Sequence, residues 1–147
     1  MKRQIYTIMT LFVLVLTSCE SYHVNGDLDG FWQVKSIEDK QTGNITHCKG
    51  DIYYSFQREL VLVSCTLSSN PTGQMKENYI AYFTHENDTI TMTDFRIYLD
   101  KDGKQAPLQN LEKFGLYELY NVFYVEKLNN KVLVLNSSKS RITLLKY

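Results

Sequence analysis

The reactive side chains of this sequence are three thiols, at Cys19, Cys48 and Cys65. Cys19 follows an almost wholly apolar run over residues 8–16, and the basic residues Lys2 and Arg3 precede that run. A helix that crosses the hydrocarbon core of a bilayer needs about 20 apolar residues, and this run is shorter. The layout is instead typical of a secretory signal, so we expect the rest of the chain to leave the cytoplasm.

The tetrapeptide Leu16-Thr17-Ser18-Cys19 is similar to the bacterial lipobox, an aliphatic residue and two small residues before a cysteine. This motif predicts cleavage of a signal peptide, residues 1–18, and acylation of Cys19 as the mature N-terminus. The alternative is an ordinary cleaved signal with an unmodified cysteine. We expect a protein of the bacterial cell envelope, held on the membrane by its lipid, with the outer membrane as the first choice.

The other two cysteines form an even pair in a compartment that favours disulfides. A turn centred on Arg58 would place Asp51 opposite Cys65, so that Cys48 is three positions out of register with Cys65. A disulfide requires Cα atoms within about 7 Å of each other. The sequence therefore leaves two alternatives, a structural disulfide or two buried free thiols that behave as small apolar groups.

Other catalytic and binding chemistry is not indicated. The three histidines are scattered, and none stands at a metal-ligand spacing from Cys, Asp or Glu. The sequence has no phosphate-binding glycine loop and no nucleophile elbow. Without Lys2 and Arg3 the chain has 14 basic and 16 acidic residues and no basic stripe, which argues against nucleic acid as a partner. We expect no catalytic residues, no metal, no cofactor and no enzymatic activity.

Short apolar or alternating runs follow one another from Gly30 onward, separated by turn residues about every ten positions, which predicts an all-β fold. Residues 20–28 are polar and resemble a flexible tether, so we expect a lipidated N-terminus and tether at 19–28 and one domain at 29–147. The architecture we expect is an antiparallel up-and-down eight-stranded β-barrel, with one short helix before the last three strands. The strands are expected at 31–37, 52–56, 60–67, 79–84, 89–93, 120–128, 132–136 and 141–147, and the helix at 108–114.

The dipeptide Asn129-Asn130 predicts a two-residue hairpin turn, because Asn tolerates positive φ. Such a turn pairs Val125 with Val134 and Tyr124 with Leu135. Both faces of this hairpin are then apolar, whereas a sheet with one solvated face alternates between apolar and polar residues. We therefore expect the helix at 108–114 to cover the outer face.

The tripeptide Gly30-Phe31-Trp32 resembles the G-x-W motif of lipocalins and lipocalin-like barrels. The whole chain resembles the small lipocalin-like lipoproteins of certain Gram-negative bacteria, which are lipid-anchored calycin-type β-barrels. The shared features are a lipobox, the start Leu28-Asp29-Gly30-Phe31-Trp32, the segment Phe114-Gly115-Leu116 and a terminal Leu-Lys-Tyr. The resemblance implies that Gly30 and Trp32 mark one closed end of the barrel, with Arg141 or Lys146 packed across the indole. Since that family is largely without assigned function, the resemblance indicates a fold and a location more than an activity.

A set of aromatic side chains on the expected strands supplies the candidate binding residues, namely Tyr54, Phe56, Tyr79, Tyr82 and Tyr124. If these residues face inward, they form an apolar cavity with a few hydroxyl groups, which is typical of small-molecule sites. They could equally fill the core, because an eight-stranded barrel has little spare volume. Two functions follow: a monomeric envelope protein that binds a small apolar ligand in the barrel, or an accessory lipoprotein with a filled barrel that contacts another envelope protein.

Overall fold

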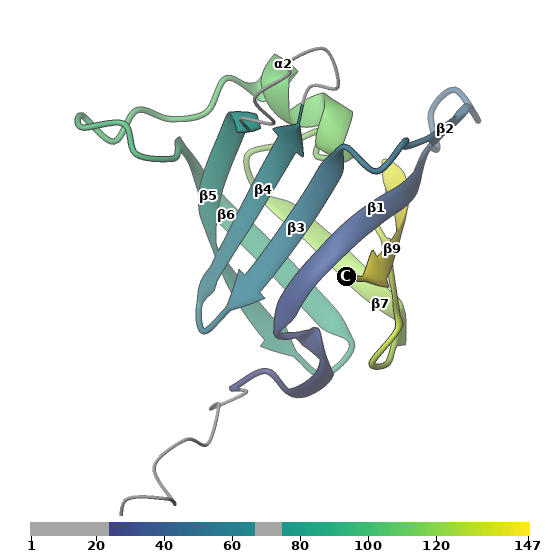
Figure 1. The fold of residues 1–147 in the computed structure, drawn as a ribbon. Helices are drawn as coiled ribbons and strands as arrows, with labels where there is room; N and C mark the ends of the chain where they lie inside the picture. Colours follow the sequence, from purple (N-terminus) through teal and green to yellow (C-terminus); the bar gives the residue numbers. More distant parts are fainter. Residues whose placement is uncertain (1–23, 67–74) are drawn as a thin grey trace, which may run out of the picture.

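The computed structural model describes residues 24–66 and 75–147. Eight antiparallel strands close into a barrel, and each strand pairs with the next one around the ring until β9 pairs with β1 (Figure 1). The expected eight-stranded up-and-down barrel is confirmed. The strands of the ring are β1 (Gly30–Asp39), β3 (Ile52–Gln57), β4 (Leu60–Thr66), β5 (Met75–Glu86), β6 (Thr89–Ile97), β7 (Asn121–Leu128), β8 (Val132–Asn136) and β9 (Ser140–Lys146).

A ninth short strand, β2 (Ile45–His47), pairs with the end of β1 outside this ring. The expected helix before the last three strands is confirmed as α2 (Leu108–Leu111), which continues as the 3-10 turn η2 (Glu112–Phe114). Gly115 ends it with φ at 82°, a left-handed conformation that glycine adopts without a Cβ clash. One more 3-10 turn, η1 (Gly26–Leu28), precedes β1.

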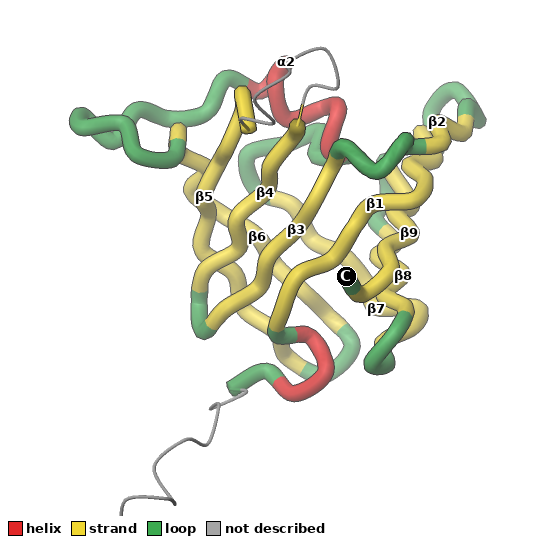
Figure 2. The backbone as a smooth tube through the Cα atoms, viewed as in Figure 1, coloured by secondary structure: helices red, strands yellow, loops and turns green. Residues whose placement is uncertain are grey.

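The two ends of the barrel are closed by these short helical segments (Figures 1 and 2). The end where β1 begins and η1 lies is called the tether end, and the end where α2 and η2 lie is called the helix end. The expectation that the tether runs to residue 28 is wrong, because η1 is folded onto the barrel and Leu28 is fully buried. The predicted signal peptide, Cys19 and the last residue of the strand expected at 60–67 lie outside the described residues.

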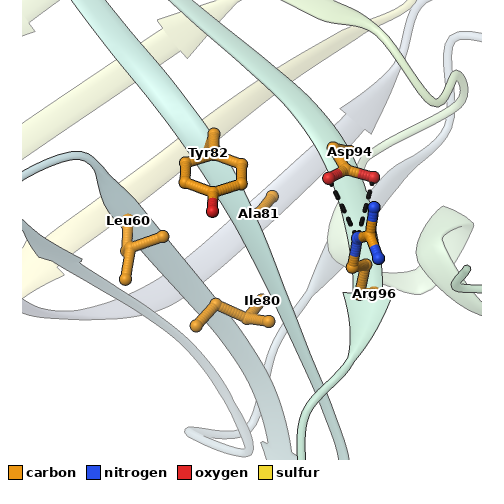
Figure 3. Close-up of a pocket in the computed structure, with 6 residues that line it drawn as sticks. All are labelled: Leu60, Ile80, Ala81, Tyr82, Asp94 and Arg96. Carbon is orange, nitrogen blue, oxygen red and sulfur yellow. Dashed lines mark hydrogen bonds and ion pairs between the residues drawn. The ribbon is translucent and has the colours of Figure 1, made fainter. Parts of the chain in front are cut away.

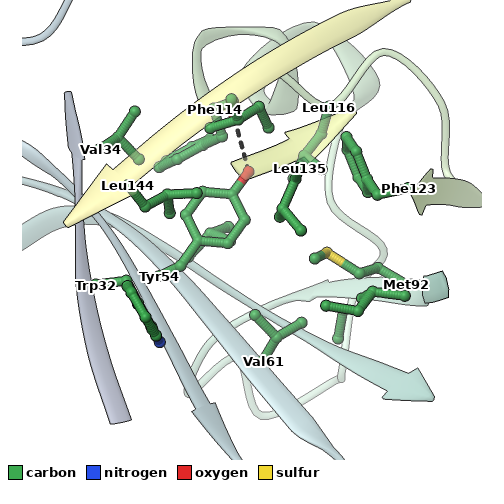
Figure 4. Packing of buried hydrophobic residues seen from close by; sticks show 14 of the residues in the cluster. Trp32, Val34, Tyr54, Val61, Met92, Phe114, Leu116, Phe123, Leu135 and Leu144 are labelled. Carbon is green, nitrogen blue, oxygen red and sulfur yellow. Dashed lines mark hydrogen bonds between the residues drawn. The ribbon is translucent and has the colours of Figure 1, made fainter. Parts of the chain in front are cut away.

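The barrel interior is filled by side chains that alternate along each strand (Figure 4). On β3, Ile52, Tyr54 and Phe56 point inward and are buried, while the residues between them are only half-buried. Burial of each such large apolar side chain contributes about 1.5–3 kcal/mol. The largest fully buried side chains include Trp32, Tyr54, Phe56, Phe95, Phe114 and Phe123.

The last hairpin differs from the expected one in two ways. Leu128 pairs with Leu133 and Val125 with Leu135, so the register expected for a two-residue turn is wrong. The side chain of Asn129 accepts hydrogen bonds from the backbone N–H groups of Lys131 and Val132 at 2.9 Å, which stabilises a longer turn, and a bulge between Val125 and Lys127 shifts the ladder again.

The expected role of the helix is also wrong. It does not cover the outer face of β7, where Val122 and Tyr124 remain exposed. Instead α2 and η2 lie over the helix end of the barrel, with Leu111 and Phe114 fully buried (Figure 1). The helix is too short to cover a strand of eight residues, and its two inward side chains fill the mouth of the barrel better than they would cover a wall.

Candidate functional site

The tether end is built around Trp32, which is fully buried. Its indole Nε1 donates a hydrogen bond to the carbonyl oxygen of Leu28 at 2.8 Å. The Nζ atom of Lys146 lies 4.3 Å from the centre of the indole ring, within the range of a cation–π contact. The same ammonium donates to the carbonyl oxygens of Asp27, at 2.9 Å, and Asp29. Burial lowers the pKa of Lys146, and the carboxylates of Asp27 and Asp29 partly oppose that shift.

Of the two basic residues expected across the indole, the structure places Lys146 there. The expectation for Arg141 is wrong, since β9 runs from the helix end to the tether end and Arg141 lies near its beginning, opposite Glu38. Its Nε atom pairs with the carboxylate of Glu126 at 2.8 Å. Gly30 has φ at 125°, and a Cβ there would lie 3.0 Å from the side chain of Lys146, so a glycine suits this position.

The helix end is closed by hydrogen bonds that sequence reasoning did not identify. The hydroxyl of Tyr54 donates to the carbonyl oxygen of Phe114 at 2.6 Å (Figure 4). The hydroxyl of Ser140 donates to the carbonyl oxygen of Gly115 at 2.7 Å. Burial raises the pKa of Tyr54 well above that of a free tyrosine, so this hydroxyl stays protonated. The Tyr54 hydroxyl therefore secures the closing segment and is not free to contact a ligand.

The five aromatic candidates for a ligand site separate into two groups. Tyr54, Phe56 and Tyr79 are buried, as expected, whereas Tyr82 and Tyr124 lie on the outer wall, and the expectation that they face inward is wrong. On β5 the inward positions are Tyr79, Ala81 and Phe83, so a residue three positions after Tyr79 must point outward. On β7 the inward neighbours of Tyr124 are likewise buried.

Two hollows of the described surface lie on the outer wall, across β3, β4, β5 and β6. The first has a volume of about 410 Å³ and is lined by Leu60, Ile80, Ala81, Tyr82, Asp94 and Arg96 (Figure 3). The second has a volume of about 510 Å³ and is lined by Ser55, Gln57, Arg58, Leu60, Leu62, Ile80 and Tyr98. Because Leu60 and Ile80 line both, the two hollows form one continuous surface, which we call the outer-wall groove.

A bulge in β6 shapes this groove. Ile80 pairs with Arg96 and Tyr82 with Thr93, so two residues of β6, Asp94 and Phe95, face a single residue of β5. Asp94 has φ at 57°, which is uncommon for a residue with a side chain. Its carboxylate accepts hydrogen bonds from Arg96 Nε at 2.9 and 3.0 Å (Figure 3). The bulge therefore holds the Arg96 side chain at the rim of the groove.

The two remaining cysteines lie near the helix end, and both are free thiols. The backbone N–H of Cys48 donates to Lys35 on β1, while Cys65 is buried on β4 opposite Ile52. Burial, together with the nearby carboxylate of Asp51, raises the pKa of Cys48 to about 11. The same two causes raise the pKa of Cys65. Both thiols are therefore protonated at neutral pH, which makes them poor nucleophiles.

Two classes of site are not found in the described part of the chain. Over residues 24–66 and 75–147, no three His, Cys, Asp or Glu side chains are grouped so that they could bind a metal ion. Within the same residues, there is no helix whose length and apolar character together would let it cross a membrane. The candidate functional surface among the described residues is the outer-wall groove. The predicted lipidation of Cys19 lies outside these residues and stays a prediction.

Comparison with known proteins gives a consistent fold. A family model described as a lipocalin-like domain matches residues 14–147. The crystal structure of a lipocalin-like protein from Bacteroides uniformis aligns with a TM-score of 0.61 and 20% identity, over 83% of this chain and 100% of that chain. An uncharacterized protein from Bacteroides eggerthii aligns with a TM-score of 0.61 and 24% identity, over 82% and 99% of the two chains. No curated protein matches this sequence.

Proposed function

Since this chain belongs to the lipocalin-like domain family, we propose that it is a lipid-anchored protein of the bacterial cell envelope that works through contacts of its outer wall. In this proposal Cys19 carries the lipid and the outer-wall groove makes the functional contact. The chain acts as a monomeric binding or accessory protein and not as an enzyme. The lipocalin-like barrel is a fold that supports ligand binding in general.

One contrast supports the outer wall as the site of contact. Fully buried side chains of Trp32, Tyr54 and Phe123 occupy the described interior. The hydroxyl of Tyr54 already donates a hydrogen bond to a backbone carbonyl. The groove, in comparison, presents apolar side chains and guanidinium groups to solvent over hollows of about 410 and 510 Å³. These volumes lie in the range of about 300–1,000 Å³ that is usual for binding sites.

The lipid anchor is tested by Cys19→Ala. We expect this substitution to abolish incorporation of a fatty-acid analogue and to leave unprocessed precursor, because acylation needs the thiol of the lipobox. Cys48→Ala is the matched control and should leave the label unchanged. Equal labelling of wild type and Cys19→Ala would rule out the anchor.

The outer-wall contact is tested by hydroxyl-radical footprinting of the full chain in its native envelope and after purification. Tyr82 and Tyr124 are exposed by 54% and 55% in the structure. Tyr82 lines the groove, whereas Tyr124 lies outside it on β7, beyond β6, so the two form a matched pair. We expect the envelope to slow the oxidation of Tyr82 several-fold and to leave that of Tyr124 unchanged. Equal oxidation of Tyr82 in both states would contradict a contact at this wall.

The second candidate function is a small apolar ligand inside the barrel, which the lipocalin-like fold favours. Extraction of the protein from its host, followed by mass spectrometry of the extract, distinguishes the two. One small molecule per chain, with Tyr82 unprotected in the envelope, would favour the interior. Protection of Tyr82 without a stoichiometric small molecule would favour the outer wall.

A further inference from the structure

The beginning of the folded domain is fixed beside the outer-wall groove. The side-chain Nδ2 of Asn25 donates to the carbonyl oxygen of Arg58 at 2.8 Å, and to Asp29 Oδ1 at 2.6 Å. The backbone N–H of Asn25 donates to the other carboxylate oxygen of Asp29 at 3.0 Å. Arg58 stands in the turn between β3 and β4 at the tether end, and its side chain lines the larger hollow. The chain therefore enters the domain next to this guanidinium.

The distance from Asn25 to the expected anchor is short. Five residues separate Cys19 from Asn25, and the six steps of the chain from one to the other extend at most about 20 Å. If Cys19 carries acyl chains, as in the proposed function, the turn at Arg58 can rise only about this far above the membrane surface. The Debye length at physiological salt is about 8 Å, so the charge of Arg58 lies within reach of headgroup charges when the tether is not fully extended.

The side chains around Arg58 combine a cation with apolar and aromatic surface. Among the described residues Arg58 is exposed and forms no ion pair, although Glu59 follows it in the same turn. Leu60 and Tyr82 pair across β4 and β5 directly above that turn, and both are exposed. Tyrosine is enriched at membrane–water interfaces, because its ring is apolar and its hydroxyl is polar.

We propose that the outer-wall groove docks on the membrane that holds the anchor, with Arg58 binding an anionic lipid headgroup and with Leu60 and Tyr82 entering the interfacial region. This inference rests on the proposed lipid anchor and names the partner of the same wall. The exposed carboxylates of Glu86 and Asp88 flank the neighbouring turn at the tether end. Their repulsion from an anionic surface disfavours an end-on contact and favours a barrel that leans onto the wall of β3, β4 and β5.

The test uses the full chain, purified in its acylated form and inserted into vesicles. One set of vesicles contains phosphatidylethanolamine and phosphatidylglycerol, and the other contains phosphatidylcholine alone. Hydroxyl-radical footprinting then compares Tyr82 with Tyr124, which is equally exposed but lies outside the groove on β7. We expect several-fold slower oxidation of Tyr82 in the anionic vesicles, a smaller effect in phosphatidylcholine and no change at Tyr124.

Arg58→Gln should restore the oxidation of Tyr82 in anionic vesicles, because it removes the charge and keeps a polar side chain. Lys131→Gln is the matched control, since Lys131 is exposed at the tether end in the turn after β7, and it should leave Tyr82 protected. Three outcomes would contradict the docking. If the acylated protein is bound to vesicles and Tyr82 and Tyr124 are oxidised at the same rate, the docking is wrong and the lipid anchor is still supported. Protection in the native envelope but not in vesicles would also overturn it, in favour of a protein partner. The mass of the N-terminal peptide reports the acyl chains separately, and a peptide without them would overturn both proposals.

Discussion

The two ends of the barrel are both closed by a buried aromatic residue that donates a hydrogen bond to a backbone carbonyl, but they depend on different parts of the chain. At the tether end, Trp32 donates to Leu28, four residues away. At the helix end, Tyr54 donates to Phe114, 60 residues away, and Ser140 donates to Gly115, 25 residues away. The tether end is a local motif, while the helix end is assembled from three distant segments.

This difference affects how each end should respond to substitution. The tether end concentrates its packing in one large side chain, so loss of that side chain should have a single large effect. The helix end distributes its stability over a glycine, two hydroxyl groups and two short helical turns, so each change there should have a smaller effect. The predictions below compare the two ends by the free energy of unfolding.

The largest effect is expected for Trp32→Ala. Removal of a fully buried large aromatic side chain leaves a cavity and costs about 3–5 kcal/mol. Urea unfolding followed by circular dichroism measures the loss, with Phe31→Ala as the control because Phe31 lies on the outer wall and is only half-buried. An unfolding midpoint that Trp32→Ala leaves unchanged would show that Trp32 does not close the tether end.

Gly115→Ala should be the most damaging single change at the helix end. A Cβ at Gly115 would lie 2.9 Å from Ile142 Cδ1 and 3.1 Å from Ile37 Cγ2, and φ is 82°. Overpacking of this kind costs about 1–3 kcal/mol in addition to the left-handed strain of about 1–2 kcal/mol. Gly43→Ala isolates the strain, because Gly43 has φ at 72° and open space around it. The same urea unfolding measures both variants. Equal losses of unfolding free energy would mean that Ile142 and Ile37 shift to accommodate the added Cβ at no measurable cost.

The comparison of the two ends also explains what the sequence could predict. The G-x-W motif is local, and the resemblance it carries led to Trp32 and to Arg141 or Lys146 as its partner, of which the structure places Lys146 there. The positions of the ring strands were predictable because alternation is a local pattern, although β5 begins four residues before its expected bound and β6 ends four residues after it. The helix at 108–114 was predictable from its spacing and from Gly115. The position of the helix over the barrel mouth was not predictable from the sequence. It depends on hydrogen bonds with Tyr54 and Ser140, two residues that are far from the helix in the sequence.

The candidate site was less predictable than the fold, for two physical reasons. The expected ligand-lining set combined residues three positions apart on one strand, Tyr79 and Tyr82, although alternation separates them onto two faces. The outer-wall groove depends on the bulge at Asp94, where a residue with a side chain adopts positive φ. Composition and periodicity give no indication of such a bulge. Strand β2 was missed because its three residues are all exposed and show no apolar alternation.

A smaller effect at the helix end is expected for Tyr54→Phe. This change leaves the ring in place and removes the hydroxyl, so that the carbonyl oxygen of Phe114 loses a buried partner. An unsatisfied buried acceptor costs about 1–3 kcal/mol. Tyr53→Phe is the matched control, because the Tyr53 hydroxyl donates to Gly50 at 2.6 Å in a half-buried position that water can reach. A larger loss for Tyr53→Phe, in urea unfolding of both variants, would contradict the closing role of Tyr54.

The smallest effect is expected at the tether end, for Lys146→Met. The substitution keeps the apolar stem and removes the ammonium that lies over Trp32, a contact that contributes about 1 kcal/mol. Lys131→Met, at an exposed lysine of the same end, should change the free energy of unfolding by less than about 0.5 kcal/mol. Urea unfolding at neutral pH measures both variants. A gain of stability in Lys146→Met would mean that burial of the charge destabilises the fold by more than the contacts of the ammonium with Trp32, Asp27 and Asp29 stabilise it.

The pH dependence of the same variant distinguishes the Lys146 contact from ordinary packing. Burial lowers the pKa of Lys146 below its ordinary value of 10.5, so between the folded-state pKa and 10.5 the unfolded chain binds more protons. Stability contributed by this group is therefore constant at low pH and rises with pH through that alkaline window. Tyrosines such as Tyr54, whose pKa is raised, act in the opposite direction above about pH 10, but they are present in both proteins and cancel in the difference. The stability of wild type relative to Lys146→Met should thus increase from neutral pH towards pH 10. A constant difference would show that the ammonium is fully solvated, and a falling difference would show that its contacts stabilise the charge more than burial destabilises it.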